Sequence, residues 1–351
     1  MADICIALDA MGGDHGPRVI VPAALEAVTS FAHLHIILVG QRAAIEPHLE
    51  AHQALKHPRI TLKEASQVVE MGELPAVALR RKRDSSMRVA INLVKEGVAG
   101  ACVSAGNTGA LMTIARFVLK MLPGINRPAI VYSLPTMKGH SHVLDLGANV
   151  NCSAEDLFQF AVMGAVLAMA VDNNLYPKVG LLNIGSEVIK GNETVKKAAE
   201  LLSNAPVALN YIGFVEGDDI YKGTADVVVC DGFVGNVALK TSEGLAKMLI
   251  HFAREEFTRH WYAKCVALLA RPILKALQKR FDPALYNGAS FLGLNGIVIK
   301  SHGNADVKAF ATAIQVAMLE VEKNVLTTIK TEVLAQLGTV TKRGDQRDVL
   351  A

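Results

Sequence analysis

Short apolar runs alternate with helical stretches along most of this 351-residue chain, and this alternation limits its possible folds more than any other feature. Strands that are separated by helices form a mostly parallel sheet with helices on both faces. We therefore predict a three-layer αβα fold. Eight runs have the length and apolar content of buried strands: Ile4–Leu8, His35–Val39, Ala101–Ser104, Ala129–Ser133, Val143–Leu146, Lys178–Asn183, Val207–Tyr211 and Val227–Cys230.

The chain is long enough, and with 51% hydrophobic residues apolar enough, to bury a large core. We predict one α/β catalytic domain over residues 1–337, followed by a mobile tail, 338–351, that has little apolar content. Within the domain, residues 243–282 change to a long basic and amphipathic helical pattern with a break near Pro272. This pattern predicts a helical hairpin that projects from the sheet. It suits an anionic partner, a membrane surface or the packing face of a dimer.

Composition excludes several classes of function. A net charge of +3 without an aromatic and basic stripe predicts no nucleic-acid partner. The five cysteines are widely spaced and lack a CxxC pair, so we predict neither disulfides nor a cysteine zinc site. Such cysteines suit a protein of the reducing cytoplasm. The longest apolar run, Phe160–Val171, is too short to span a bilayer and predicts a buried helix.

Several nucleotide and hydrolase motifs are absent from the sequence. It has no P-loop, no GxGxxG after the first strand, no GxSxG and no HExxH. These absences argue against nucleotide binding, acyl-enzyme chemistry of the α/β-hydrolase kind and zinc hydrolysis. We predict no cofactor and no metal.

Polar turns that contain glycine follow several of the predicted strands. The first combines Gly12 and Gly13 with Asp9, Asp14 and His15, directly after the strand Ile4–Leu8. Four more turns begin at Ser104, Asp145, Asn183 and Asp231. Because parallel strands end at one edge of a sheet, we expect these turns to converge into a cleft lined with amides and carboxamides.

A cleft of this kind suits an anion, and a small phosphate is the obvious candidate. The first-turn amides of the helices after Asn107 and after Ser153 would add positive partial charge. Lys190 follows the turn at Asn183, and we predict that it lies on a helix as the only base near these turns. Taken singly, each turn also fits an ordinary connection, and Lys190 fits an ordinary surface lysine.

Long motifs give the chain a resemblance to a known family. They are Leu8–Asp14, Val103–Ala110, Asp231–Asn236 and Phe291–Gly296, the last followed by Ser301–Gly303. With them the chain resembles the acyl-acyl carrier protein:phosphate acyltransferase family, often called PlsX, of bacterial phospholipid synthesis. The resemblance extends from Asp3 to about Leu337. It implies a homodimer with the fold of phosphotransacetylases and of isocitrate and isopropylmalate dehydrogenases.

The resemblance also implies an activity. A fatty acyl group would move from the phosphopantetheine thioester of acyl carrier protein to inorganic phosphate, and the acyl phosphate would pass to a membrane glycerol-phosphate acyltransferase. Such an enzyme is cytoplasmic and touches the inner face of the cell membrane peripherally. The basic hairpin would then dock either the acidic carrier protein or anionic lipid.

Phosphate is already an anion at neutral pH, so we expect it to attack the thioester directly. By the resemblance Lys190 and Asn236 are catalytic, while His15 is either a proton donor to the departing thiolate or a structural residue. The residues predicted to bind substrate or phosphate are Asp9, Gly12, Gly13, Ser104, Gly106, Asn107, Thr108, Asp145, Asn149, Asn183, Glu187, Asp231 and Gly235.

Three other functions remain open at this point. A phosphotransacetylase-like enzyme would use a coenzyme A thioester in place of the carrier protein. A nicotinamide-dependent dehydrogenase of related fold would need an aspartate cluster for a metal and an arginine-rich pocket, and the sequence shows neither. A scaffold for the carrier protein or the membrane would have no activity, and the intact run of polar turns argues against it.

Overall fold

One mixed sheet organises the molecule. The structure, a computed structural model, describes residues 3–205, 209–280 and 282–333. The strand order in the sheet is β3-β2-β1-β4-β11-β10-β5-β6-β9-β7-β8. The strands are β1 (Ile4–Asp9), β2 (Leu34–Gly40), β3 (Ile60–Glu64), β4 (Ala101–Ser104), β5 (Ala129–Thr136), β6 (Gly139–Leu144), β7 (Lys178–Leu182), β8 (Asn210–Val215), β9 (Val227–Val229), β10 (Ala289–Leu292) and β11 (Ile297–Lys300).

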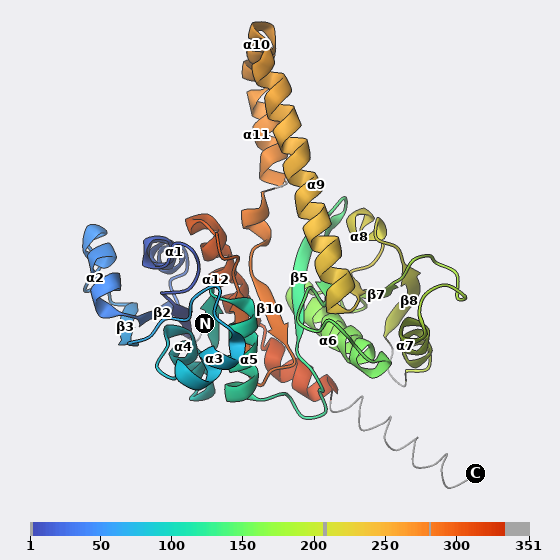
Figure 1. Cartoon of the computed structure of the whole chain (residues 1–351), viewed down its shortest axis with the longest axis horizontal. Helices are drawn as coiled ribbons and strands as arrows, with labels where there is room; N and C mark the ends of the chain where they lie inside the picture. Colours follow the sequence, from blue (N-terminus) through green and yellow to red (C-terminus); the bar gives the residue numbers. More distant parts are fainter. Residues whose placement is uncertain (1–2, 206–208, 281, 334–351) are drawn as a thin grey trace.

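Helices cover both faces of this sheet (Figure 1). They are α1 (Pro17–Ser30), α2 (Arg42–Ala51), α3 (Pro75–Arg81), α4 (Ser86–Lys95), α5 (Thr108–Leu119), α6 (Ala154–Asp172), α7 (Glu193–Ser203), α8 (Asp219–Lys222), α9 (Gly232–Arg259), α10 (Trp261–Leu269), α11 (Arg271–Arg280) and α12 (Val307–Glu322), with a 3-10 turn at Pro283–Tyr286. Successive residues of β1 point to opposite faces: Leu8 packs in one core with α1 and α12, and Ala7 in another with α4 and α5. The predicted three-layer, mostly parallel α/β fold is confirmed.

The predicted strands agree with the structure except where the chain forms hairpins. Ala101–Ser104 is β4 as predicted. Val143–Leu146 overlaps only the end of β6, because β5 and β6 form a hairpin in which β6 begins already at Gly139. Part of the predicted strand Val207–Tyr211 lies outside the described residues, and β8 begins at Asn210. The prediction missed β3, β10 and β11.

Three antiparallel pairings reverse the direction of half the sheet. β10 runs against both β11 and β5, and β5 runs against β6. All other pairings are parallel, so β1 and β4 point one way and β6, β9 and β7 point the other way. The expectation that all polar turns meet at one edge is therefore wrong: they form two groups at opposite ends of the strands.

Helix α6 is the apolar helix that the sequence predicts. Among the described residues it is the one helix long and apolar enough to cross a membrane, but 78% of its most apolar window is buried. Phe160 and Met163 are fully buried and pack with Leu144 and Val229 of the sheet. Burial on this scale is that of a core helix.

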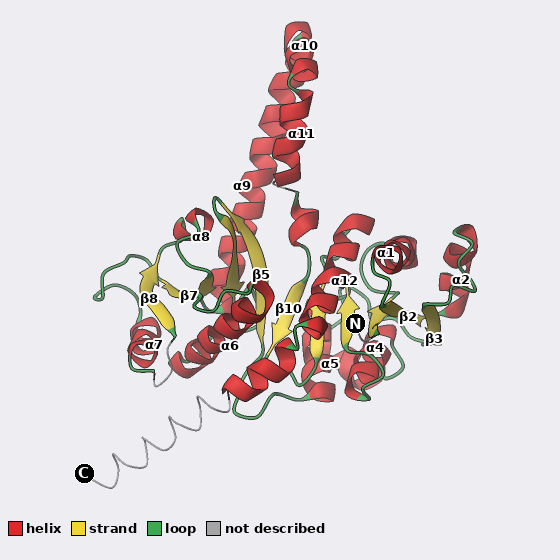
Figure 2. Cartoon of the chain, turned by 180° about the vertical axis from the view of Figure 1, so that it is seen from behind, coloured by secondary structure: helices red, strands yellow, loops and turns green. Residues whose placement is uncertain are grey.

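Helices α9, α10 and α11 project far beyond the sheet (Figures 1 and 2). α9 runs for 28 residues, and α10 ends at Leu269, just before Pro272 occupies the second position of α11. Many large apolar side chains of this projection are exposed, among them Leu249, Phe252, Trp261 and Leu269. The predicted tail, 338–351, lies outside the described residues.

A buried carboxyl group on α12 makes the stability of the fold depend on pH. The side chain of Glu320 is fully buried beneath β10, where the Ser290 hydroxyl donates a hydrogen bond to Oε2 over 3.0 Å. Burial raises the pKa of Glu320 to about 7, well above its ordinary value of 4.5. Between these two pH values the unfolded chain loses this proton while the folded protein keeps it. Stability therefore falls as pH rises through this range and stays low above it.

We predict that Glu320→Gln is more stable than the wild type at pH 8, by on the order of 2 kcal/mol, because it removes this penalty and keeps a partner for Ser290. The difference should shrink toward pH 5, and urea unfolding at both pH values measures it. Glu50→Gln, on the exposed side of α2, is the control and should leave the pH dependence of stability unchanged. A Glu320→Gln variant less stable than the wild type at pH 8 would contradict the argument.

Candidate active site

Three of the predicted polar turns leave the sheet at one edge, where β6, β9 and β7 end. We call it the Asp145 edge. These strands are neighbours and parallel, with Leu144 opposite Val229 and Val229 opposite Leu181. Adjacent strands lie about 4.8 Å apart. The turns that begin at Asp145, Asp231 and Asn183 therefore start side by side, as the sequence predicts for these three.

Asp145 is the hub of this edge. Its carboxylate accepts four hydrogen bonds, at Oδ1 from the amides of Ile130 (3.1 Å) and Ala148 (3.0 Å), and at Oδ2 from the amide (2.7 Å) and Nδ2 (2.9 Å) of Asn149. Burial raises the pKa of Asp145, and these four bonds oppose the rise. Since protein groups occupy both oxygens, we assign Asp145 a positioning role in place of the predicted binding of substrate or phosphate.

Asn149 extends the hub toward α9. Its Nδ2 also donates to the carbonyl of Pro128 over 2.7 Å, and its own carbonyl accepts the amide of Gly232 over 2.8 Å. The predicted binding residue Asn149 thus has its side-chain amide engaged by the protein. It fixes where α9 begins.

The first turn of α9 packs directly on the Asp145 turn. Asp231 caps the helix, with its Oδ1 accepting the amide of Val234 over 2.9 Å. Gly235 lies so close to the Asp145 carbonyl that a Cβ atom would collide with it. The next residue, Asn236, is exposed, and its side chain lies against Gly147. This packing presents Asn236 at the Asp145 edge.

Lys190 lies in the turn after β7. Asn183 closes this turn by donating from Nδ2 to the Lys190 carbonyl over 3.1 Å. Lys190 Nζ lies 2.8 Å from Glu187 Oε2, and this hydrogen bond raises the pKa of Lys190 and lowers that of Glu187. The predicted position of Lys190 on a helix is wrong, because Asn192 caps α7 and the helix begins only at Glu193. Lys190 is nevertheless charged and exposed.

A second polar cluster, the Asp9 cluster, lies where β1 and β4 end and contains Asp9, Gly12, Gly13, Ser104 and Gly106. Ser104 Oγ donates to Asp9 Oδ2 over 2.6 Å and accepts the amide of Gly106 over 3.0 Å. Gly12 lies so close to Asp9 and to the Gly106 amide that a side chain would not fit. Burial raises the pKa of Asp9, and among the described residues its Oδ1 has no hydrogen-bond partner.

Lys300 adds a buried cation to the Asp9 cluster, which the sequence analysis missed. Its Nζ donates to the carbonyls of Ala105, over 3.2 Å, and Ser301. Burial lowers the pKa of Lys300 to about 8, and the charges of Asp9 and Asp14 oppose this. The prediction that Lys190 is the only base near the polar turns is therefore wrong. The signal was present, since Lys300 directly precedes the Ser301–Gly303 motif.

Three further predicted residues lie on the same side as the Asp9 cluster. Asn107 caps α5 and donates to the carbonyls of Met71 and Glu73, so its whole side chain is occupied. Thr108 is exposed at the first position of α5. His15 is exposed as well, with Nδ1 3.3 Å from Nη2 of Arg18.

The start of α6 does not offer the free amides that the sequence analysis expects. Ser153 Oγ accepts the amide of Asp156 over 3.1 Å, and Asp156 Oδ2 accepts the amide of Ser153 over 3.0 Å. This reciprocal cap satisfies two donors and places a carboxylate at the helix terminus. The expectation that this helix attracts an anion is wrong.

Helix α9 begins at the Asp145 edge and carries two charges that act on His302, a residue close in sequence to Lys300 of the Asp9 cluster. Asn236, Lys240 and Glu243 share one face of the helix, and Lys240 Nζ pairs with Glu243 Oε2 over 3.0 Å. Burial and the charge of Lys240 lower the pKa of His302, which follows Lys300 and Ser301, whereas Glu243 raises it. From Asn236 to Glu243 this face is about 10 Å long, at 1.5 Å per residue.

Comparisons with known proteins give a family and a fold. Residues 4–328 match the model of a family described as fatty acid synthesis protein. The chain is 60% identical over 322 residues to a phosphate acyltransferase of Nitrosococcus oceani, covering 92% of this chain and 94% of that protein. It is 61% identical over 320 residues to one of Methylococcus capsulatus, with 91% and 94% covered.

Two solved structures share the architecture. A phosphotransacetylase from Streptococcus pyogenes superposes with a TM-score of 0.64 at 18% identity, over 91% of this chain and 94% of that one. EutD phosphotransacetylase from Staphylococcus aureus gives 0.58 at 15% identity, over 94% of both chains. At these identities the likeness concerns the fold alone, and it agrees with the predicted phosphotransacetylase fold.

The close contact between α9 and the Asp145 turn predicts opposite effects for two glycine substitutions in one helix. Gly235→Ala should destabilise the protein by about 2 kcal/mol or more, because its Cβ meets the Asp145 backbone. Gly244→Ala has open space around it and should be neutral or stabilising by about 1 kcal/mol, the usual gain of alanine in a helix. Chemical denaturation measures both, and equal stability of the two variants would mean that α9 does not rest on this turn.

Proposed function

The chain belongs to the fatty acid synthesis protein family, with phosphate acyltransferases as its relatives, and we propose that this acyltransferase forms fatty acyl phosphate from acyl-acyl carrier protein and inorganic phosphate. The product would enter phospholipid synthesis. The observation that carries the proposal is the position of two exposed side chains, Lys190 in the turn after β7 and Asn236 near the start of α9 after β9, because β7 and β9 are neighbouring strands of the Asp145 edge.

Phosphate would lie between these two side chains. Lys190 has three N–H donors, of which Glu187 takes one, so two remain for the anion. A phosphate oxygen attacks the thioester carbon and forms the new C–O bond, while the carbonyl oxygen becomes an oxyanion. The amide of Asn236 donates to this oxyanion or orients the phosphate. The C–S bond then breaks and the carrier thiolate leaves with its electron pair.

Preorganised donors are the main source of rate acceleration in such a scheme. A donor aimed at a developing oxyanion contributes on the order of 3 kcal/mol. The contacts of Asp145 and Asn149 hold the start of α9, and therefore Asn236, before substrate arrives. Holding two reactants in line replaces a covalent nucleophile.

The cysteines near this edge support direct transfer. Cys152 Sγ contacts the carbonyl of Asn149, and Cys230 Sγ contacts that of Asp145. Burial raises the pKa of Cys152 to about 12 and that of Cys230 well above its usual value. Neither thiol is ionised at neutral pH, so neither offers the thiolate that an acyl-enzyme would need.

Exposed apolar side chains lie close in sequence to both Lys190 and Asn236, and they support a long acyl donor. Ile184, Val188 and Ile189 in the Lys190 turn are each about four-fifths exposed, at 79%, 80% and 84%. Phe233 and Val237 flank Asn236 on α9 and are also exposed. A fatty acyl chain would cover part of this surface, whereas a short acetyl group would not.

His15 has no part in this mechanism. It is exposed beside Arg18 and follows β1, which runs opposite to the strands of the Asp145 edge because three antiparallel pairings separate them. The predicted binding residues of the Asp9 cluster likewise lie at the opposite end of the strands from the Asp145 edge. We propose that the Asp9 cluster shapes the other end of the substrate site, with Lys300 and His302 as its polar groups.

The location and partners of the enzyme follow from the same proposal. We propose a cytoplasmic homodimer that contacts the inner face of the cell membrane and passes acyl phosphate to a membrane glycerol-phosphate acyltransferase. The exposed apolar residues of α9 to α11 and the nearby bases Arg254, Arg259 and Lys264 support a covered or lipid-facing hairpin. They also fit the docking of an acidic carrier protein.

Lys190→Ala and Asn236→Ala should each lower kcat by roughly a hundredfold, the loss expected when a transition-state donor is removed. Lys222→Ala is the matched control, because Lys222 is a similarly exposed lysine in an ion pair, 2.6 Å from Asp218. It should keep near-normal activity. Thermal unfolding checks that each variant folds, and near-normal turnover in both catalytic variants would exclude the mechanism.

The substrate is tested by acyl phosphate formation from purified protein. We expect turnover with long-chain acyl-acyl carrier protein that depends on phosphate and releases free carrier protein, at a rate at least about tenfold above that with the matching acyl-coenzyme A. Faster turnover with short acyl-coenzyme A would favour a phosphotransacetylase, for which the fold is equally suitable. No phosphate-dependent release from either donor would leave the scaffold function.

A further inference from the structure

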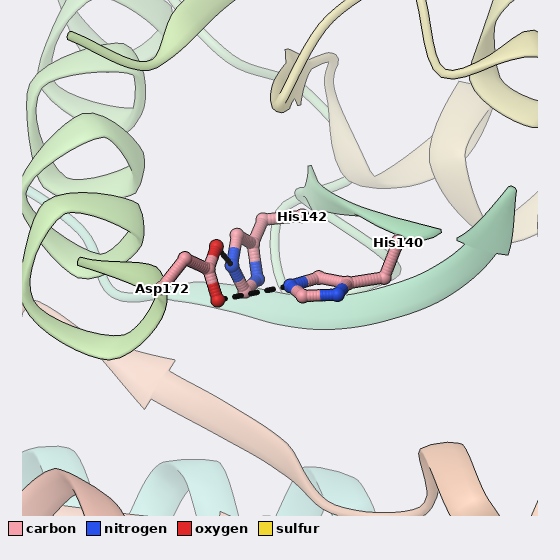
Figure 3. A group of neighbouring side chains, drawn as sticks. All are labelled: His140, His142 and Asp172. Atoms are coloured by element: carbon pink, nitrogen blue, oxygen red, sulfur yellow. Dashed lines mark hydrogen bonds and ion pairs between the residues drawn. The ribbon is translucent and has the colours of Figure 1, made fainter. Parts of the chain in front are cut away.

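Two histidines and one aspartate form a compact group away from the Asp145 edge (Figure 3). His140 and His142 are two residues apart on β6, so their side chains lie on one face of the strand. Asp172 is the last residue of α6. Three side chains from two elements therefore come together at the end of β6 opposite to Asp145.

Both imidazoles point at the same carboxylate. Nε2 of His140 lies 3.0 Å from Oδ1 of Asp172, and Nε2 of His142 lies 2.8 Å from Oδ2. One potential ligand atom from each residue lies within 4.8 Å of the others. In a tetrahedral zinc site the ligand atoms are roughly 3.3 Å apart, given zinc–nitrogen and zinc–oxygen bonds of about 2.0–2.1 Å. Small side-chain movements would bring this group to that spacing.

The surroundings of the group supply what a metal ligand needs. The Ser133 hydroxyl lies 2.9 Å from Nδ1 of His142, and as a hydroxyl it can accept the Nδ1 hydrogen when Nε2 binds a metal. The carboxylate of Asp226 adds negative charge near His140. The side chain of His142 is buried, whereas those of His140 and Asp172 are partly exposed. One side of the group is thus open for an entering ion and for a water ligand.

We propose that His140, His142 and Asp172 bind one zinc-type divalent cation, with water as the fourth ligand. Two imidazoles and one carboxylate are a donor set that zinc and neighbouring transition metals prefer over magnesium or calcium. The ion would tie the β5–β6 hairpin to the end of α6. His142 is three residues from Asp145, about 10 Å along the strand, so the ion would lie away from the turns that carry Lys190 and Asn236.

The sequence predicts no metal, because it contains no CxxC pair, no HExxH motif and no cluster of aspartates. The His-Ser-His spacing at 140–142 is visible in the sequence, but its third ligand is 30 residues further along the chain. Only the packing of α6 against β6 identifies Asp172 as that ligand.

Metal binding to the full-length protein tests the proposal. After treatment with EDTA, the Cys265→Ser variant, which lacks the exposed thiol, is titrated with Co²⁺ and with Zn²⁺. We expect one equivalent of tight binding, the visible absorption of four-coordinate Co²⁺, and a higher melting temperature with Zn²⁺. His140→Gln and Asp172→Asn in the same background should weaken binding by more than about tenfold and lose the absorption.

His33→Gln is the matched control, since His33 forms a partly exposed pair with Glu322 over 2.6 Å, with one imidazole and one carboxylate. It should bind Zn²⁺ as the parent does. Circular dichroism confirms that each variant folds. The proposal is overturned if His140→Gln binds Zn²⁺ as tightly as its parent, or if Co²⁺ gives no four-coordinate spectrum. Since metal stoichiometry is the readout, this result does not depend on the acyltransferase activity.

Discussion

The candidate site depends on a single buried carboxylate, that of Asp145. A carboxylate without water around it is stable only when donors surround it, and here the amides of β5, the following turn and Asn149 supply four. These bonds hold the turn after β6 in one conformation. The carbonyl of the same residue then meets Gly235, so the turn also fixes the start of α9. The position of Asn236 therefore depends on the hydrogen bonds that hold Asp145.

The sequence predicts the individual strands and turns better than it predicts the directions in which the strands run. Strand β4 is predicted to the residue, and the polar turns at Asp145, Asn183 and Asp231 do meet at one edge. What the sequence does not show is that β10 inserts antiparallel between β11 and β5, or that β5 and β6 form a hairpin. Both facts depend on pairing between residues far apart in the chain, for which short apolar runs carry no register signal. The Asp9 cluster was therefore expected at the wrong end.

Burial explains why one cation was predicted and another was not. Lys190 lies in an exposed turn next to glycine and asparagine, a pattern that is visible in the sequence. The prediction that Lys190 lies on a helix was wrong, because the helix begins three residues later, at Glu193. Lys300 closes a four-residue apolar strand and is buried beside Asp9, where its charge is offset by carbonyls and a carboxylate. Whether a lysine at a strand end is buried is decided by its neighbours in space, in this case Asp9 and Ala105, which are distant from it in the chain. Such neighbours are known only once the sheet is assembled.

Helix α9 links the candidate active site to the exposed projection. Asn236 lies near its start, Lys240 in its third turn acts on His302 through its charge, and its far half belongs to the exposed projection with α10 and α11. A continuous helix of 28 residues is about 42 Å long and resists bending. A partner that holds the projection, whether a second copy, a carrier protein or a lipid surface, therefore also constrains the orientation of Asn236. Gly235 passes this constraint to the Asp145 turn, because it has no side chain and its backbone lies directly against the Asp145 carbonyl.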